Sequence, residues 1–250
     1  GLALTLLSSG DDGLDIVPAR DVAIDGALVY SCLPRSTARE WLLRRHLPVV
    51  DVDQDPDPDV PSVNVDDRGG ARAAAQHLVD LGHRRIALVA LAADGGDGPG
   101  PAHSQQERLA GWYEALAPVG IEPVTCEVAT HGVDQAAAAI SELLASDDRP
   151  TGVLCFSDVL GFGVLRAAHE AGLDVPGDLS VVGFDDSPAS RHSQPALTTV
   201  HQNVVEKGRV ATAALTEAIG GTEPPVRHEV LPTSLVVRTS TAPPPADGAG

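Results

Sequence analysis

Residues 151–188 constrain the fold of this chain more than any other stretch. They read TGVLCFSDVLGFGVLRAAHEAGLDVPGDLSVVGFDDSP. Residues 152–156 form a short apolar run typical of a buried strand, and 179–184 form a second one. Between them, Ser157 or Asp158 can cap a helix. Apolar residues then recur at the spacing of an amphipathic helix: Leu160, Val164, Ala167 and Ala171. The stretch therefore predicts two parallel strands joined by a crossover helix.

Small polar and acidic residues follow both of these strands. Ser157 and Asp158 come after the first strand, and Asp185 and Asp186 end the second. In an open parallel sheet, ligands bind beyond the carboxyl ends of the strands. Adjacent residues of an extended segment point in opposite directions, so the two aspartates are not expected to converge. We expect one to face the ligand and the other to make a structural hydrogen bond.

The rest of the chain alternates expected strands and helices, which predicts an α/β protein. Strands are expected at 2–7, 27–30, 48–52, 86–91, 124–129, 197–201, 226–231 and 235–237. Helices are expected at 36–46, 66–81, 105–118, 134–145 and 204–219. The Gly- and Pro-rich residues 94–101 predict a flexible loop, and the composition of 242–250 predicts a disordered tail.

Charge and cysteine content narrow the class of protein. The formal net charge is -18, which argues against direct binding to nucleic acid because phosphate contacts need clustered Lys and Arg. No apolar run approaches the roughly 20 residues that span a bilayer. The N-terminus lacks the basic stretch that a signal peptide carries. A cytoplasmic location is therefore expected. Cys32, Cys126 and Cys155 are too few and too scattered for a disulfide framework or a zinc site. They are expected to be buried free thiols.

The sequence offers little support for catalysis or metal binding. It holds no HExxH helix and no GxSxG elbow. Residues 51–59 (DVDQDPDPD) invite a calcium interpretation, but an EF-hand loop needs Gly and a carboxylate where this chain has Pro56 and Ser62. An acidic surface loop is the preferred interpretation. We therefore expect no catalytic residue, no metal and no cofactor.

Five motifs, in order, resemble the effector-binding core of the LacI/GalR family of bacterial transcription regulators. They are VDDRGGARAAAQHLVDLGHRRIALV at 65–89, ERLAGW at 107–112, the pattern FSD…G…LRA…G…VP.D.SVVGFDD within 151–188, LTTVHQ at 197–202 and LPTSLVVRTST at 231–241. The resemblance implies a two-lobed, periplasmic-binding-protein-like fold of type I, each lobe a parallel sheet flanked by helices. One lobe would hold residues 1–65 and 204–231, and the other 66–203 and 232–240, before a disordered tail at 241–250. The family's first βα unit would precede residue 2 and is missing.

The resemblance also implies an effector cleft between the lobes. The expected effector-binding residues are Asp53, Arg108, Ser157, Asp158, Asp185 and Gln202. Arg108 would bind the effector, and Asp185 would accept hydrogen bonds from its hydroxyls. Asp53 could instead belong to the surface loop, and Asp158 could instead cap its helix. Many relatives carry Asn at the position of Ser157. Many also carry an aromatic residue that stacks on a sugar ring just before the cap of the helix at 134–145, a position where this chain has Val133.

The resemblance implies the sensor core of a LacI-type regulator, usually a repressor. The lobes would close on a small polar ligand, a sugar above all, and the ligand would shift a homodimer between DNA-binding and released states. Operator DNA would be bound only through a helix-turn-helix headpiece, which these residues lack. The alternatives are a sugar-binding protein of a transport system and a sugar-modifying enzyme. The identity of the effector is left open.

Overall fold

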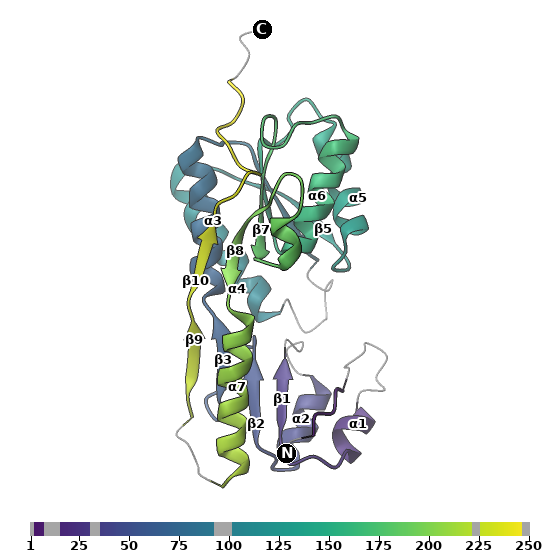
Figure 1. Ribbon diagram of the computed structural model, residues 1–250, viewed down its shortest axis with the longest axis vertical. Helices are drawn as coiled ribbons and strands as arrows, with labels where there is room; N and C mark the ends of the chain where they lie inside the picture. The colour runs from purple at the N-terminus through teal and green to yellow at the C-terminus, as the bar shows by residue number, and fades with distance from the viewer. Residues whose placement is uncertain (1–2, 8–15, 31–35, 93–101, 222–225, 247–250) are drawn as a thin grey trace. The chain divides into compact units, whose positions relative to one another are not determined.

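The computed structural model describes residues 3–7, 16–30, 36–92, 102–221 and 226–246 (Figure 1). The chain divides into two compact units. Unit 1 holds residues 1–65, 96–104 and 203–231, and unit 2 holds 66–95, 105–202 and 232–250. The chain therefore crosses between units more than once, and each unit is built from segments far apart in the sequence.

Unit 1 is built on a four-stranded parallel sheet. Its strands are β1 (Ala27–Tyr30), β2 (Val49–Val52), β3 (Ser62–Val65) and β9 (His228–Leu231), in the order β1-β2-β3-β9. Strand β1, helix α2 (Thr37–Arg44) and strand β2 form the predicted parallel unit, with Ala27 opposite Val49. Strand β3 was not predicted, because its four residues lie directly after a Pro-rich acidic stretch.

Helices pack on both faces of the unit 1 sheet, as a doubly wound fold requires. Val29 and Val49 contact Leu42 of α2 and Ala19 of the short helix α1 (Ile16–Asp21). Alternate residues of β2 belong to a second cluster with Ala211 of α7 (Val204–Ile219). Figure 1 shows α7 running alongside β2 and β3. This packing places the first turn of α7 close to the carboxyl end of β2.

Unit 2 is built on a six-stranded sheet in the order β10-β8-β7-β6-β4-β5. These strands are β10 (Thr233–Val236), β8 (Thr198–Gln202), β7 (Ser180–Asp185), β6 (Gly152–Cys155), β4 (Ile86–Leu91) and β5 (Val124–Val128). Only β10 is antiparallel to its neighbour. Strand β6, helix α6 (Asp158–Glu170) and strand β7 confirm the strand–helix–strand prediction made from residues 151–188.

Close helix pairs cover the unit 2 sheet. Helix α3 (Asp67–Leu81) packs on α4 (His103–Leu116), where a Cβ at Gly111 would lie 2.2 Å from the Arg68 carbonyl. Helix α5 (Val133–Leu144) packs on α6, where a Cβ at Gly163 would lie 2.5 Å from the Val133 carbonyl. Short 3-10 helices η1 (Ala117–Val119) and η2 (Pro188–Arg191) complete the unit. Glycine is required at both contacts because the backbones approach so closely.

Two local predictions differ from the structure. Residues 3–7 of the expected first strand form no strand, and Leu4 and Leu6 are 88% and 90% exposed. An apolar run becomes a strand only where another strand accepts its hydrogen bonds, and none lies beside it among the described residues. The expected disorder from 241 onward also fails at its first two residues. Thr241 contacts the His77 ring, and Ala242 accepts a hydrogen bond from His83.

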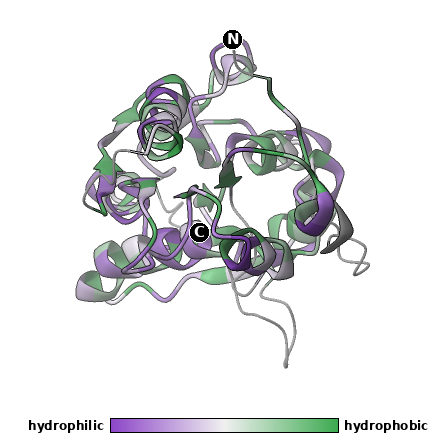
Figure 2. Ribbon diagram, turned by 90° about the horizontal axis from the view of Figure 1, so that it is seen from below, coloured by the Kyte–Doolittle hydropathy of each residue, from purple (hydrophilic) through white to green (hydrophobic). Residues whose placement is uncertain are grey.

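Several other expectations are met or lie outside the described residues. Cys155 is a buried free thiol, and Cys126 is a free thiol that is only half-buried. Cys32, the loop at 94–101 and residues 247–250 lie outside the described part of the chain. Hydrophobic and hydrophilic residues both recur along the helices in Figure 2. None of the described helices is long and apolar enough to span a membrane.

Candidate functional site

Arg108 is the best-fixed of the predicted site residues in unit 2. It lies on α4 and is only 5% exposed. Its Nε donates to Asp67 Oδ1 at 2.7 Å, and its Nη1 donates to the Phe156 carbonyl at 2.5 Å. Its guanidinium carbon lies 3.5 Å from the centre of the Phe184 ring. The guanidinium is therefore held rigidly before any ligand binds.

Asp185 and Gln202 lie at the same edge of the sheet as Arg108. Asp185 Oδ1 is 3.9 Å from Arg108 Nη1 and accepts a hydrogen bond from Gln202 Nε2 at 2.7 Å. The Asp185 side chain is 31% exposed, whereas that of Arg108 is 6% exposed. The structure thus brings three predicted residues together as one polar network. Its carboxylate, that of Asp185, is partly exposed.

Asp186 makes structural contacts while Asp185 lies in the Arg108 network, which is the expected division, although neither residue is extended, with φ 117° at Asp185 and 52° at Asp186. Its carboxylate is 3% exposed and accepts hydrogen bonds from Arg238 and His201. Burial acts against ionisation, but the hydrogen bonds and positive charges outweigh it, so the pKa of Asp186 is lowered. Asp186 therefore anchors the strand end, while Asp185 faces the Arg108 network.

Asp158 has structural partners and does not cap its helix. Ser157 is the N-cap of α6 and accepts a hydrogen bond from the Leu160 amide. The fully buried Asp158 accepts from the Thr199 hydroxyl at 2.5 Å and from the Ser187 amide at 2.7 Å. Burial raises the pKa of Asp158. The structure thus ties Asp158 to the neighbouring strand and loop.

His131 is a candidate residue that the sequence analysis missed. Its Nε2 lies 2.5 Å from Ser157 Oγ, and its ring meets the Phe156 ring edge-on at 6.2 Å. Burial, and then the charge of Arg108, lower the pKa of His131. The lowered pKa favours the neutral imidazole, and Nε2 forms a hydrogen bond with the Ser157 hydroxyl whose donor depends on the tautomer.

His131 escaped notice because the start of α5 was misplaced. Asp134 is a favoured cap residue, but the structure places Gly132 at the cap and begins the helix at Val133. Asp134 instead pairs with Arg166 on α6. The ring that precedes the helix belongs to His131 and not to the Val133 position. The sequence signal for His131 is a side-chain ring within three residues of the start of the helix.

In unit 1, Asp53 follows β2 and pairs with a lysine. Lys207 Nζ, from the first turn of α7, lies 2.5 Å from Asp53 Oδ2. Asp53 and Lys207 are 7% and 4% exposed. Lys207 Nζ also lies 5.6 Å from the centre of the ring of Tyr30, the last residue of β1. Asp53 is therefore part of a buried ion pair, and Lys207 was not predicted.

Backbone strain gathers at these strand ends. Asp53, Asp185 and Asp186 have φ values of 54°, 117° and 52°, a region that non-glycine residues rarely occupy. Such strain costs of order 1–3 kcal/mol per residue and clusters at binding sites. The strain supports the assignment of both surfaces as candidate sites.

The acidic stretch at 51–59 is the expected surface loop only in its second half, because residues 51–54 are buried and 55–59 are largely exposed. Asp51 lies within β2, is fully buried and accepts a 2.6 Å hydrogen bond from Arg39 Nη2, which also contacts Asp57. Buried Gln54 exchanges hydrogen bonds with Asn64 at the end of β3. Within the described residues, no group of His, Cys, Asp or Glu could hold a metal ion. The carboxylates of Asp51 and Asp57, which a calcium site would need, are paired with the guanidinium of Arg39.

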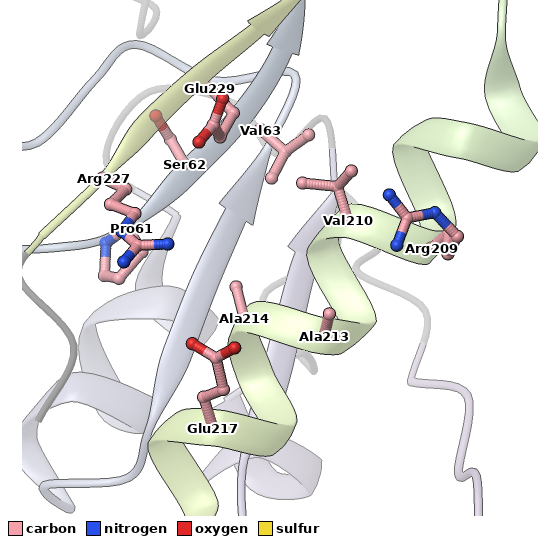
Figure 3. A pocket seen from close by; sticks show the side chains of 10 residues that line it. All are labelled: Pro61, Ser62, Val63, Arg209, Val210, Ala213, Ala214, Glu217, Arg227 and Glu229. Atoms are coloured by element: carbon pink, nitrogen blue, oxygen red, sulfur yellow. The ribbon is translucent and has the colours of Figure 1, made fainter. Parts of the chain in front are cut away.

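A small cavity of about 150 Å³ lies elsewhere in unit 1, between α7 and strands β3 and β9 (Figure 3). Its lining residues are Pro61, Ser62, Val63, Arg209, Val210, Ala213, Ala214, Glu217, Arg227 and Glu229. None of the predicted site residues is among them. The candidate site is therefore the set of strand ends, and this cavity is separate from it.

Comparison with known proteins gives the same class of fold. The family described as periplasmic binding protein-like domain matches residues 75–241. The regulator CelR in complex with cellobiose is 31% identical, with a TM-score of 0.83 over 94% of this chain and 72% of that chain. A LacI family regulator from Enterococcus faecalis V583 with bound ribose is 26% identical, with a TM-score of 0.79 over 90% of this chain and 80% of that one.

Among curated proteins, the HTH-type transcriptional regulator reg1 of Streptomyces lividans is 40% identical over 194 residues. The match covers 75% of this chain and 54% of reg1, so the chain spans about half the length of that relative. Two α/β units with polar groups at their strand ends thus define a periplasmic-binding-protein-like domain. The chain belongs to the LacI family of transcriptional regulators and covers the effector-binding core of that family.

Proposed function

We propose that this chain is the sugar sensor of a transcriptional regulator and that the Arg108–Asp185–Gln202 network binds the sugar. The observation that carries the proposal is the partly exposed Asp185 carboxylate beside a guanidinium already fixed by Asp67 and Phe156. Charged acceptors and donors held in place before binding recognise hydroxyl groups with little loss of conformational entropy. Relatives solved with ribose and with cellobiose support a saccharide as the ligand.

Ser157, Gln202 and His131 complete the proposed contacts in unit 2. Gln202 orients the Asp185 carboxylate, and the Ser157–His131 pair adds a neutral donor and acceptor. Asp158 holds the neighbouring strand and loop in place through Thr199 and Ser187, and it is not proposed as a ligand contact. Asp53 is proposed as a further ligand contact in unit 1.

The test is a thermal-shift screen with ribose, glucose, maltose and cellobiose. A sugar present at one hundred times its dissociation constant adds about 2.7 kcal/mol to the free energy of unfolding. For a chain of this size, that gain raises the melting temperature by roughly 5–10 °C. Asp185→Ala should abolish the rise. The matched control is Asp134→Ala, which removes a carboxylate that is 83% exposed on α5. A sugar-induced rise that survives Asp185→Ala would contradict the assignment.

The wider regulatory role is proposed for the longer protein. The net charge of -18 makes this chain a poor partner for DNA, so operator binding is assigned to a helix-turn-helix headpiece outside these residues. The sugar would act by shifting a homodimer between two states of different DNA affinity. In a gel-shift assay, this chain should bind no operator DNA at physiological salt. The longer protein should bind it in a sugar-dependent manner, and sedimentation should give a dimer.

A further inference from the structure

The ion pair between Lys207 and Asp53 is buried, like the pair between Arg108 and Asp67 in unit 2. Lys207 is the single lysine of the chain, and its side chain is 6% exposed while that of Asp53 is 9% exposed. Burying either charge alone is strongly unfavourable, so the two side chains stabilise each other as an ion pair. The pair therefore fixes the orientation of the Asp53 carboxylate.

One oxygen of this carboxylate lacks a partner. Lys207 Nζ takes Oδ2, whereas Oδ1 is buried and has no hydrogen-bond partner in the described part of the chain. Buried acceptors left unsatisfied are rare in folded proteins and call for an explanation. Asp53 also stands at the carboxyl end of β2 in a strained conformation, with φ 54°. Both features mark Oδ1 as an acceptor that is open to a donor from a ligand, since none of the described residues supplies one.

An exposed aromatic ring lies beside the pair. Tyr30 is 64% exposed, and its ring centre is 5.6 Å from Lys207 Nζ. A tyrosine ring offers an apolar face for C–H groups next to polar partners. A saccharide carries C–H groups and hydroxyls side by side, which matches this combination of ring and carboxylate.

We propose that Lys207 is a positioning residue that sets Asp53 Oδ1 to accept a hydrogen bond from a hydroxyl of an uncharged saccharide. The proposal rests on the proposed sugar-sensing function. It specifies in addition that the ligand is uncharged at the position that faces Asp53. The pair as a whole is neutral, so it offers no net attraction to an ammonium group. An amino sugar would bring its positive charge close to Lys207. The chain should therefore discriminate a hydroxyl from an amine here.

Removing Lys207 should reverse this discrimination. Without Lys207, Asp53 becomes an uncompensated carboxylate, and an ammonium group would serve as its counter-ion better than a hydroxyl would. A purely structural lysine would lower the affinity for all ligands together. The relative affinity for amino and hydroxyl forms of one sugar is thus the readout that separates the two roles.

The experiment is calorimetric titration of this chain with ribose, glucose, maltose and cellobiose. Each sugar that binds is then compared with its mono-amino-deoxy forms, one hydroxyl replaced at a time, at about pH 6 so that the amine is charged. We expect the wild type to bind the parent sugar at least about tenfold more tightly than the amino form at the position that faces Asp53. Lys207→Met should shift this ratio at least about tenfold towards the amine, and Lys207→Arg should preserve it.

Other variants keep the test decisive if Lys207→Met folds poorly. Asp53→Asn retains a neutral acceptor and should lower affinity for the parent sugar at least about tenfold. Asp53→Asn combined with Lys207→Met leaves no buried charge and should show neither preference. Arg209→Met is the matched control, because Arg209 is an exposed cation of α7 that pairs with Glu206.

The possible results separate the two proposals. If a sugar binds the wild type and its selectivity is the same in Lys207→Met and Asp53→Asn, the role of Lys207 is overturned while the sugar-sensing proposal stands. If none of the parent sugars binds but an amino form does, the assignment of an uncharged ligand is wrong. If neither kind of sugar binds, the proposed function fails and this inference fails with it.

Discussion

Replacing Arg108 with Met tests whether the unit 2 surface is held rigid by a buried charge pair. The side chains of Arg108 and Asp67 are 6% and 1% exposed, and a 2.7 Å hydrogen bond joins them. Methionine keeps much of the side-chain length and its contact with the Phe184 ring. It removes the positive charge and the hydrogen bond to the Phe156 carbonyl.

The expected loss follows from this burial. Removing one partner of a buried ion pair leaves an uncompensated charge and destabilises a protein by about 3–5 kcal/mol. The lost hydrogen bond to a carbonyl from a charged donor is worth about 1.5–3 kcal/mol, but the two effects are coupled and do not add. We therefore expect the free energy of unfolding of unit 2 to fall by about 3–5 kcal/mol.

Urea denaturation followed by circular dichroism measures this loss. The matched control is Arg68→Met, which breaks a 2.9 Å hydrogen bond to Glu114 between side chains that are 50% and 42% exposed. Exposed pairs contribute little to stability because solvent screens them, so the control should lose far less stability than Arg108→Met. The comparison holds the chemical change constant and varies only the burial.

A double variant identifies the cause. If the uncompensated carboxylate of Asp67 is responsible, Arg108→Met combined with Asp67→Leu should be more stable than Arg108→Met alone, since apolar pairs often replace buried ion pairs without loss. A loss below about 1 kcal/mol for Arg108→Met would refute the argument. So would a double variant whose loss equals the sum of the two single losses.

Three further outcomes are expected. Gly163→Ala should destabilise the chain by about 1–3 kcal/mol because its Cβ would meet the α5 backbone, whereas Gly208→Ala, with nothing within 4 Å, should be neutral or stabilising in urea unfolding. Burial lowers the pKa of His83, so the unfolded chain binds more protons between that pKa and about 6.5, and stability falls as the pH drops through this range. His83→Asn should show a smaller fall in urea midpoint from about pH 7.5 to 5.5, and an equal fall would contradict the assignment. Burial raises the pKa of the Cys155 thiol, so iodoacetamide should modify Cys155 only after urea unfolds the chain, as peptide mass spectrometry can determine.

Much of the fold follows from local patterns that tertiary packing then reinforces. The strand–helix–strand from Gly152 to Asp185 was predicted because its apolar periodicity and its Ser157 cap agree. Residues 3–7 have an equally apolar sequence but form no strand. A strand needs a hydrogen-bonding neighbour, and the presence of that neighbour is not encoded in the run itself.

Two predicted site residues, Asp185 and Gln202, lie at strand ends, and Arg108 was named from the family resemblance. Arg108, Asp185 and Gln202 were all named, and the structure brings them into one network. Lys207 was missed because it lies more than one hundred and fifty residues from Asp53, and its neighbours in α7 read as an ordinary helix. His131 was missed because the start of its helix was placed too late.

The sequence by itself determined most of the strands and helices, though not β3, and which of those strands end in acidic or polar groups. Only the tertiary structure decided which of these groups are paired, buried or left with an open acceptor. Asp158 and Asp53 show the difference. Both follow buried strands, but Asp158 is satisfied by Thr199 and Ser187, while Asp53 is held by Lys207 on one oxygen only. Periodicity reports burial along one element, whereas the partner of a buried charge comes from another element and depends on how the two pack.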